Sequence, residues 1–257
     1  MLKVLAVTCL ISLVGLAQKA PAPKRDLNGT WEPLRGLDGV QPSGARDMPA
    51  DGKPEHELPY TPYGREMFKK NHPSNGPTEV SPGEENDPGH SCDPHGFPRE
   101  NLFELRATQL IQNPSQLVML YTYGRNYRVI WSDGRELPKD PDPHWFGYSV
   151  GKWKDDYTFV VETNGTDSRT WLDNAGRPHS EDLIVEEQFH RVDKDTMELT
   201  TIINDPKVYS KPWVAQNKLP MHLLPPNFTL VEMMCSPSEL NEYNKRHGNL
   251  GTITPKK

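Results

Sequence analysis

The amino-acid sequence predicts an all-β protein, an antiparallel up-and-down β-barrel of about eight to ten strands. Apolar and polar residues alternate with a period of two over much of the chain after residue 101, as in half-buried strands. Short polar turns separate these segments, so that consecutive segments predict hairpins. A long run of hairpins favours a barrel because closure leaves no exposed sheet edge. A two-sheet sandwich is the alternative.

The composition excludes several classes of protein. The chain has 257 residues, with 29 basic against 35 acidic side chains and a formal net charge of −6. A negative chain without a long basic run is not suited to nucleic acid. Its 26 prolines and 19 glycines interrupt the chain too often for a helical bundle. The one long apolar run, at the N-terminus, is too short to span a bilayer, so no integral membrane span is expected.

The first 17 residues are typical of a secretory signal peptide. Lys3 precedes an apolar run from Val4 to Leu16, and Gly15 and Ala17 place small residues before a cleavage site. We therefore expect an exported protein, periplasmic or extracellular, with residues 18–257 as a single barrel domain.

Cleavage would remove Cys9 and leave Cys92 and Cys235. Two thiols in an oxidising compartment predict one disulfide, with two free thiols as the alternative. No cysteine or histidine spacing is typical of a zinc site, so neither a metal nor a cofactor is expected.

The first predicted strand covers residues 27–31. A proline-rich segment follows, residues 33–100, and it is mostly loop with one helix from Pro62 to Lys70. A loop segment of this length is unusual in a compact domain, so we expect it to wrap the barrel or to form a lid.

The period-two pattern then predicts a short strand around Phe103 and four hairpins. The hairpins pair residues 117–123 with 127–131, 147–153 with 157–163, 182–192 with 196–203, and 213–219 with 228–234. A short helix is expected over residues 239–247.

Two resemblances accompany this pattern. Gly29-Thr30-Trp31 resembles the G-x-W signature that opens lipocalins and related calycin barrels, in which the tryptophan packs under the barrel floor. The chain departs from lipocalins in its length and in the long insertion after the first strand. Longer segments resemble a family of exported bacterial proteins of unknown function: residues 140–153, 170–173, 178–181, 187–189 and 205–213. That resemblance implies export and a β-rich barrel, and it implies no activity.

The densest polar cluster spans residues 169–181. His179 is a candidate general base, Asp173 and Glu181 supply carboxylates, and Ser180 supplies a hydroxyl. An imidazole beside a carboxylate is what general acid–base catalysis needs. The alternative is an ordered loop in which Asp173 and Ser180 cap turns.

Glu187 is expected to point into the barrel. One face of its strand reads Leu183, Val185, Glu187 and Phe189, so the carboxylate would lie among apolar neighbours. A buried carboxylate must be paired or protonated. It could therefore bind a ligand or move a proton, or it could form a structural ion pair with Arg128 or Arg191.

Aromatic side chains with polar tips suit a small planar or amphipathic ligand. We expect a ligand-binding site that is lined by aromatic residues and one arginine: Tyr121, Tyr123, Tyr148, Trp153, Trp171, Trp213 and Arg128.

The leading hypothesis is an exported, lipocalin-like barrel that binds such a ligand in its interior. The alternatives are a hydrolase or isomerase that uses His179 with Glu187 or Asp173, and a structural envelope protein. An enzyme requires His179 within hydrogen-bond reach of a carboxylate at a pocket. A binding protein requires a cavity on the order of 300 Å³ or more. A structural protein predicts a barrel filled by side chains and an exposed apolar patch outside it.

Overall fold

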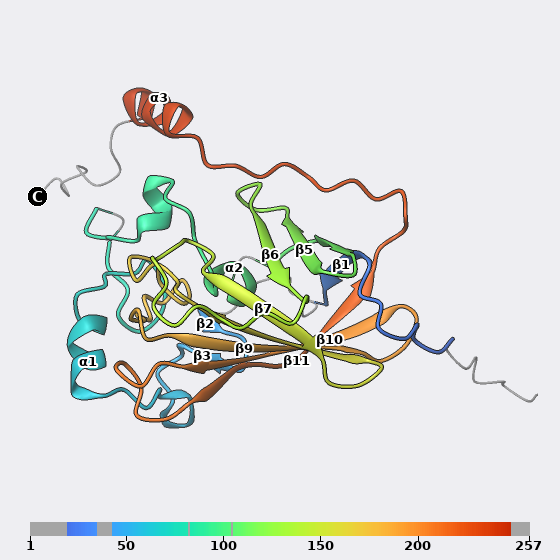
Figure 1. The fold of residues 1–257 in the computed structure, drawn as a ribbon. Helices are drawn as coiled ribbons and strands as arrows, with labels where there is room; N and C mark the ends of the chain where they lie inside the picture. The colour runs from blue at the N-terminus through green and yellow to red at the C-terminus, as the bar shows by residue number, and fades with distance from the viewer. Residues whose placement is uncertain (1–19, 35–42, 82, 104, 248–257) are drawn as a thin grey trace, which may run out of the picture.

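The computed structural model describes residues 20–34, 43–81, 83–103 and 105–247, and the expected signal peptide lies outside these ranges. Nine strands close into a barrel in the order β1-β11-β10-β9-β8-β7-β6-β5-β4, and β4 pairs back onto β1 (Figure 1). The predicted all-β barrel is thereby confirmed. The barrel strands are β1 (Gly29–Pro33), β4 (Thr108–Gln112), β5 (Gln116–Tyr121), β6 (Tyr127–Trp131), β7 (Tyr148–Trp153), β8 (Thr158–Asn164), β9 (Ile184–Arg191), β10 (Thr196–Asn204) and β11 (Trp213–Leu223).

The remaining elements are short. Two strands form a separate small sheet, β2 (Gly44–Ala45) and β3 (Met48–Pro49). The helices are α1 (Pro62–Phe68), α2 (Arg99–Leu102), α3 (Pro237–His247) and two 3₁₀ turns at Pro54–His56 and Pro88–Ser91. Helices were predicted over residues 62–70 and 239–247, and α1 and α3 confirm both.

Three of the four predicted hairpins are present, namely β5/β6, β7/β8 and β9/β10. The β7/β8 turn shows how the local sequence determines where a hairpin forms. The Asp155 carboxylate accepts hydrogen bonds from the backbone N–H groups of Tyr157 and Thr158, both at 2.7 Å. Such Asx turns let the chain reverse within a few residues.

One strand pair departs from the predicted antiparallel, up-and-down pattern. Strands β6 and β7 run parallel, and only two residue pairs are in register, Ile130 with Ser149 and Trp131 with Val150. The connection between them, residues 132–147, contains three prolines and runs back along the barrel as a loop. Proline cannot donate a ladder hydrogen bond, which explains why this segment returns without forming a strand.

The fourth predicted hairpin is wrong. Strand β11 runs unbroken to Leu223 and pairs with both β10 and β1, which closes the barrel. Residues 228–234 form no strand, and Met233 makes a single bridge to Tyr123. Two consecutive prolines, Pro225 and Pro226, separate this segment from the sheet.

The strand expected around Phe103 is also wrong. Residues Arg99–Leu102 form the short helix α2, all four of whose residues are buried, and the strand in this region is β4, further along the chain. The barrel has two hydrophobic cores, and the first contains Trp31 and Phe189. Leu102 belongs to the second core, with Phe97, Val185, Ile203 and others from one end of the barrel. Helix α2 therefore plugs this end of the barrel.

The proline-rich segment builds the outer side of the second core. Tyr60 forms an antiparallel bridge with Tyr209, and the Thr61 hydroxyl donates to the Lys207 carbonyl at 2.7 Å. A Cβ on Gly64 would lie 2.2 Å from the Val208 carbonyl oxygen, so only glycine permits this close approach of α1. The segment thus packs around the plugged end of the barrel.

Trp31 fills the opposite end. Its side chain is fully buried, its indole N–H donates to the Leu27 carbonyl at 3.0 Å, and the Arg191 guanidinium lies 4.6 Å from its ring centroid. Arg191 in turn donates to the carbonyl oxygens of Asp26 and Lys194.

The predicted disulfide is confirmed, and it joins Cys92 to Cys235 across a sequence separation of 143. It fastens the C-terminal strap, which we define as residues 224–247. This strap runs along the outside of the barrel from β11 to α3 (Figure 1). Its backbone meets the barrel where Met233 N–H donates to Thr122 and Gly124 N–H donates to Met233. Among the described residues, no helix has the length and apolarity needed to cross a membrane.

Replacing both cysteines by serine is expected to free the strap and leave the barrel folded. In the chain-entropy model, a disulfide that closes a loop of this length adds about 5 kcal/mol to the free energy of unfolding. The barrel gains this stabilisation only if the strap cannot detach while the barrel stays folded. Hydrogen exchange with mass spectrometry will then show lost protection in residues 224–247 and unchanged protection in β9 and β10. Equal loss of protection in the barrel strands would contradict this expectation.

Candidate functional site

A buried ion pair lies in the middle of the barrel. Glu187 on β9 points inward, as predicted, and its Oε2 atom lies 2.6 Å from Nη2 of Arg128 on β6. The two side chains are 0% and 1% exposed. Of the roles considered for Glu187, the structure therefore shows the ion pair with Arg128. A ligand-binding carboxylate would have kept a free oxygen, but Asn101 of α2 donates to Oε1 at 2.6 Å.

Both members of this pair make further contacts inside the barrel. Arg128 donates to the hydroxyl groups of Ser149 at 3.0 Å and Thr163 at 2.7 Å. The Phe97 ring centroid lies 3.8 Å from its guanidinium carbon. The Tyr121 hydroxyl donates to Asn101 at 2.9 Å, and burial raises the pKa of Tyr121 far above its usual range. The buried charges are thus compensated by an uninterrupted hydrogen-bond network.

His179 is placed as a structural residue. It is fully buried, with Nε2 lying 2.8 Å from the Thr170 hydroxyl and Nδ1 lying 3.1 Å from the Ser180 carbonyl oxygen. Burial lowers its pKa and holds the imidazole neutral. His179 makes no hydrogen bond to Asp173 or Glu187, so the structure does not bring the proposed acid–base partners together.

The other members of that cluster order the loop over residues 167–183. Asp173 accepts from the Ala175 N–H at 3.0 Å and pairs with Arg177 at 3.2 Å. Ser180 binds Asp205 through both its hydroxyl and its backbone N–H, at 2.9 and 2.6 Å, whereas Glu181 is exposed. This arrangement matches the alternative in which the cluster is an ordered loop.

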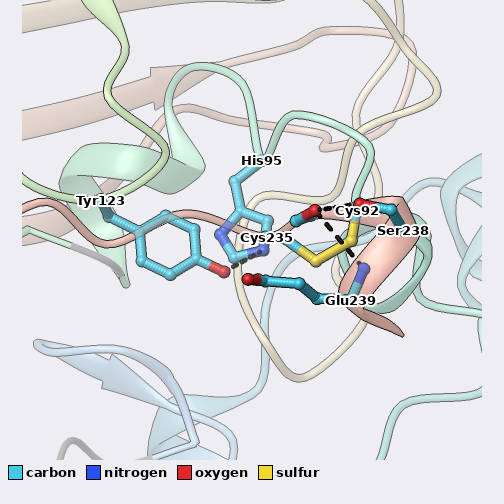
Figure 2. The surroundings of a disulfide bond; sticks show 7 residues. Cys92, His95, Tyr123, Cys235, Ser238 and Glu239 are labelled. Carbon is cyan, nitrogen blue, oxygen red and sulfur yellow. Dashed lines mark hydrogen bonds between the residues drawn. A yellow bond between two sulfur atoms is a disulfide. The ribbon is translucent and has the colours of Figure 1, made fainter. Parts of the chain in front are cut away.

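Most of the aromatic residues expected to line a ligand lie elsewhere. Tyr121, Trp171 and Trp213 are buried in the cores, and Trp153 packs on Phe159. Tyr123 stacks on His95, with ring centroids 4.7 Å apart, next to the disulfide (Figure 2). Of the predicted ligand-binding residues, only Tyr148 and Arg128 line a cleft that lies beside β6 and β7.

This cleft has a volume of about 840 Å³ and lies beside the start of β6 and β7. It forms where the two parallel strands pair over only two residues, so that the sheet opens on either side of that contact. The β5–β6 turn, the proline-rich connection 132–147 and residues 167–169 complete its walls. Its lining combines tryptophans and arginines, chiefly Trp131, Trp145, Tyr148, Arg125, Arg135 and Arg169.

Guanidinium groups stack on both tryptophans. Arg135 lies 3.7 Å from the Trp131 ring centroid, and Arg169 lies 4.5 Å from that of Trp145. Asp133 and Asp167 hold these arginines in position through charged hydrogen bonds. The walls of the cleft are therefore flat, rigid and bordered by cations.

Arginines are the most numerous charged residues of the lining. There are four of them, and each pairs with a carboxylate: Arg125 with Glu232, Arg128 with Glu187, Arg135 with Asp133 and Arg169 with Asp167. Ser149 also lines the cleft, so the cleft meets the network around the ion pair. Such a lining offers planar surfaces for stacking and guanidinium groups that can donate hydrogen bonds.

The sequence indicated only part of this site. Trp131 and Trp145 belong to the aromatic residues clustered along the chain, but nothing in their spacing shows that they face one cleft. The parallel β6–β7 pair brings them together, and the signal for it was the run of prolines between them. Among the described residues, no group of three or more His, Cys, Asp or Glu side chains could hold a metal ion.

Comparison with protein-family models, with curated proteins and with solved structures gives no match for this chain.

The ion pair is expected to behave as a unit. Glu187→Leu leaves a buried guanidinium without its partner and should cost about 3–5 kcal/mol of unfolding free energy, as should Arg128→Met. The double variant removes both charges and should lose less than the sum of the two single losses. Urea unfolding followed by circular dichroism measures all three. Strictly additive losses would contradict the coupling.

Two neutral histidines are expected to make stability depend on pH. Burial, with the nearby charge of Arg99, lowers the pKa of His95 from 6.5 to about 3, and burial lowers that of His179. Their contribution is complete above the unfolded pKa of 6.5 and is lost as the pH falls below it, because only the unfolded chain takes up the protons. Each histidine should change the free energy of unfolding by at most about 1.4 kcal/mol per pH unit.

Urea unfolding between about pH 7 and pH 5 tests this slope against His179→Asn, which should reduce it. A slope that is the same in the variant would show that His179 does not contribute.

Proposed function

We propose that this protein is exported and binds a small aromatic or amphipathic anion in the cleft beside β6 and β7. The observation that carries the proposal is the pair of tryptophans, each stacked with an arginine, that border a cleft of about 840 Å³. Planar guanidinium and indole groups suit a ligand with an aromatic ring and a carboxylate, sulfonate or phosphate.

The proposed site lies beside the barrel and not in its interior. The interior that a lipocalin-like pocket would occupy is filled at one end by Trp31 and its apolar neighbours, in the middle by the ion pair, and at the other end by α2. These side chains favour an external site, with Arg128 at the base of the cleft, over a ligand inside the barrel.

The disulfide supports the proposed export. Bonds such as Cys92–Cys235 form and persist in oxidising compartments and are rare in the cytosol. An enzymatic role for His179 has less support, because this residue is buried and does not line the cleft.

Isothermal titration calorimetry with naphthalene-2-sulfonate and its neutral counterpart 2-naphthol tests the proposal. We expect the sulfonate to bind at least about tenfold more tightly, because charged hydrogen bonds contribute more than neutral ones. Arg135→Gln with Arg169→Gln removes the stacked cations from an exposed rim and should abolish this preference.

The matched control is Arg65→Gln with Arg246→Gln, which removes two ion-paired arginines that do not line the cleft. Equal affinity for the two probes, or equal weakening in rim and control variants, would overturn the proposal.

A further inference from the structure

A second pocket, of about 280 Å³, lies where the proline-rich segment packs against the plugged end of the barrel. It shares no lining residue with the cleft beside β6 and β7. The chain around Pro49–Leu58, the last residue of α1 and the Pro77–Thr78 turn enclose it. Its walls are mostly apolar, formed by Pro49, Pro54, Leu58, Tyr60, Phe68 and Pro77.

Tyr60 is the rigid part of this wall. Its ring stacks on Phe68 with centroids 5.3 Å apart and lies 5.2 Å from the ring of Tyr209. Burial raises the pKa of Tyr60 far above its usual range, so the hydroxyl stays neutral. The pocket therefore keeps a fixed aromatic surface at neutral pH.

Arg177 supplies the charge. Its side chain is 4% exposed and yet lines the pocket. Its hydrogen bonds to Asp173 and to the Met48 carbonyl both use Nη1, and the guanidinium also hydrogen-bonds the Tyr60 hydroxyl. A guanidinium fork matches a carboxylate in shape and charge.

The other charged residues of the lining are compensated at the rim. Lys53 and His56 both pair with Asp51, at 3.1 and 2.9 Å. Glu57 pairs with Arg65 at 3.2 Å. Arg177, itself paired with the buried Asp173, is thus the buried cation of the lining, and an anion small enough to enter would meet it among apolar walls.

We propose that this pocket binds a small organic monocarboxylate, with its carboxylate on Arg177 and an aromatic or branched apolar group against Tyr60 and Leu58. The proline-rich segment would then have a binding role of its own, independent of the proposed function of the cleft. The volume fits an acid of about the size of benzoate, at the lower limit of small-molecule sites.

Benzoate and its neutral isostere benzamide test the proposal by ligand-observed NMR on the full chain. We expect saturable binding of benzoate, at least about tenfold tighter than that of benzamide. Arg177→Met should abolish the preference. Because that change leaves the buried Asp173 unpaired and could unfold the loop, Thr78→Trp serves as a second variant that fills the mouth from an exposed position.

Asn75→Trp is the matched control, since it adds the same bulk at a nearby exposed position outside the lining. Benzoate binding that is lost in Thr78→Trp and kept in Asn75→Trp supports the site. No saturable binding, equal binding of benzamide, or binding unchanged in Thr78→Trp overturns it. Loss of benzoate binding in Arg135→Gln with Arg169→Gln would likewise overturn it, because the acid would then occupy the cleft.

Discussion

The buried ion pair between Arg128 and Glu187 is the constraint around which the barrel is organised. Removing two charges from water costs several kcal/mol per ion, so the fold must supply a partner for each remaining donor and acceptor. Ser149 and Thr163 supply them from β7 and β8, and Asn101 supplies one from α2. Helix α2 is thus held in the barrel end by hydrogen bonds to Glu187 as well as by apolar packing.

The filled interior explains why the candidate site lies on the side of the barrel. Apolar side chains from both cores and the buried ion pair occupy the barrel interior. The cleft opens at the parallel β6–β7 contact, the weakest strand pairing of the barrel. There Arg128 belongs at once to the interior network and to the cleft surface, so the ion pair fixes the base of the site.

Features with a short-range physical cause were predictable from the sequence. The period-two pattern placed Glu187 inside, turn residues placed three hairpins, and the pair of thiols predicted the disulfide. Features that depend on contacts between distant parts of the chain were not predictable. The partner of Glu187 could have been Arg128 or Arg191, and only the strand order selects the first. His179 and Asp173 are close in the sequence, but the loop turns them toward different partners.

The cleft is the clearest example of this limit. Its walls come from the ends of two strands and from a connection whose path depends on its prolines, and no local pattern brings Trp131 and Trp145 to one surface. Likewise, the proline-rich segment reads as a loop, whereas its contacts with Tyr209 and Arg177 make it one wall of a pocket.

The chain has six tryptophans, and their indole N–H groups are separate reporters of where a ligand binds. The most direct measurement is a nitrogen–proton NMR spectrum of ¹⁵N-tryptophan-labelled protein during titration with naphthalene-2-sulfonate. We predict saturable shifts at Trp131 and Trp145, with the resonances of Trp31, Trp171 and Trp213 unchanged. Shifts centred on Trp31 or Trp153, inside the barrel, or no shift at Trp131 and Trp145 would contradict this prediction.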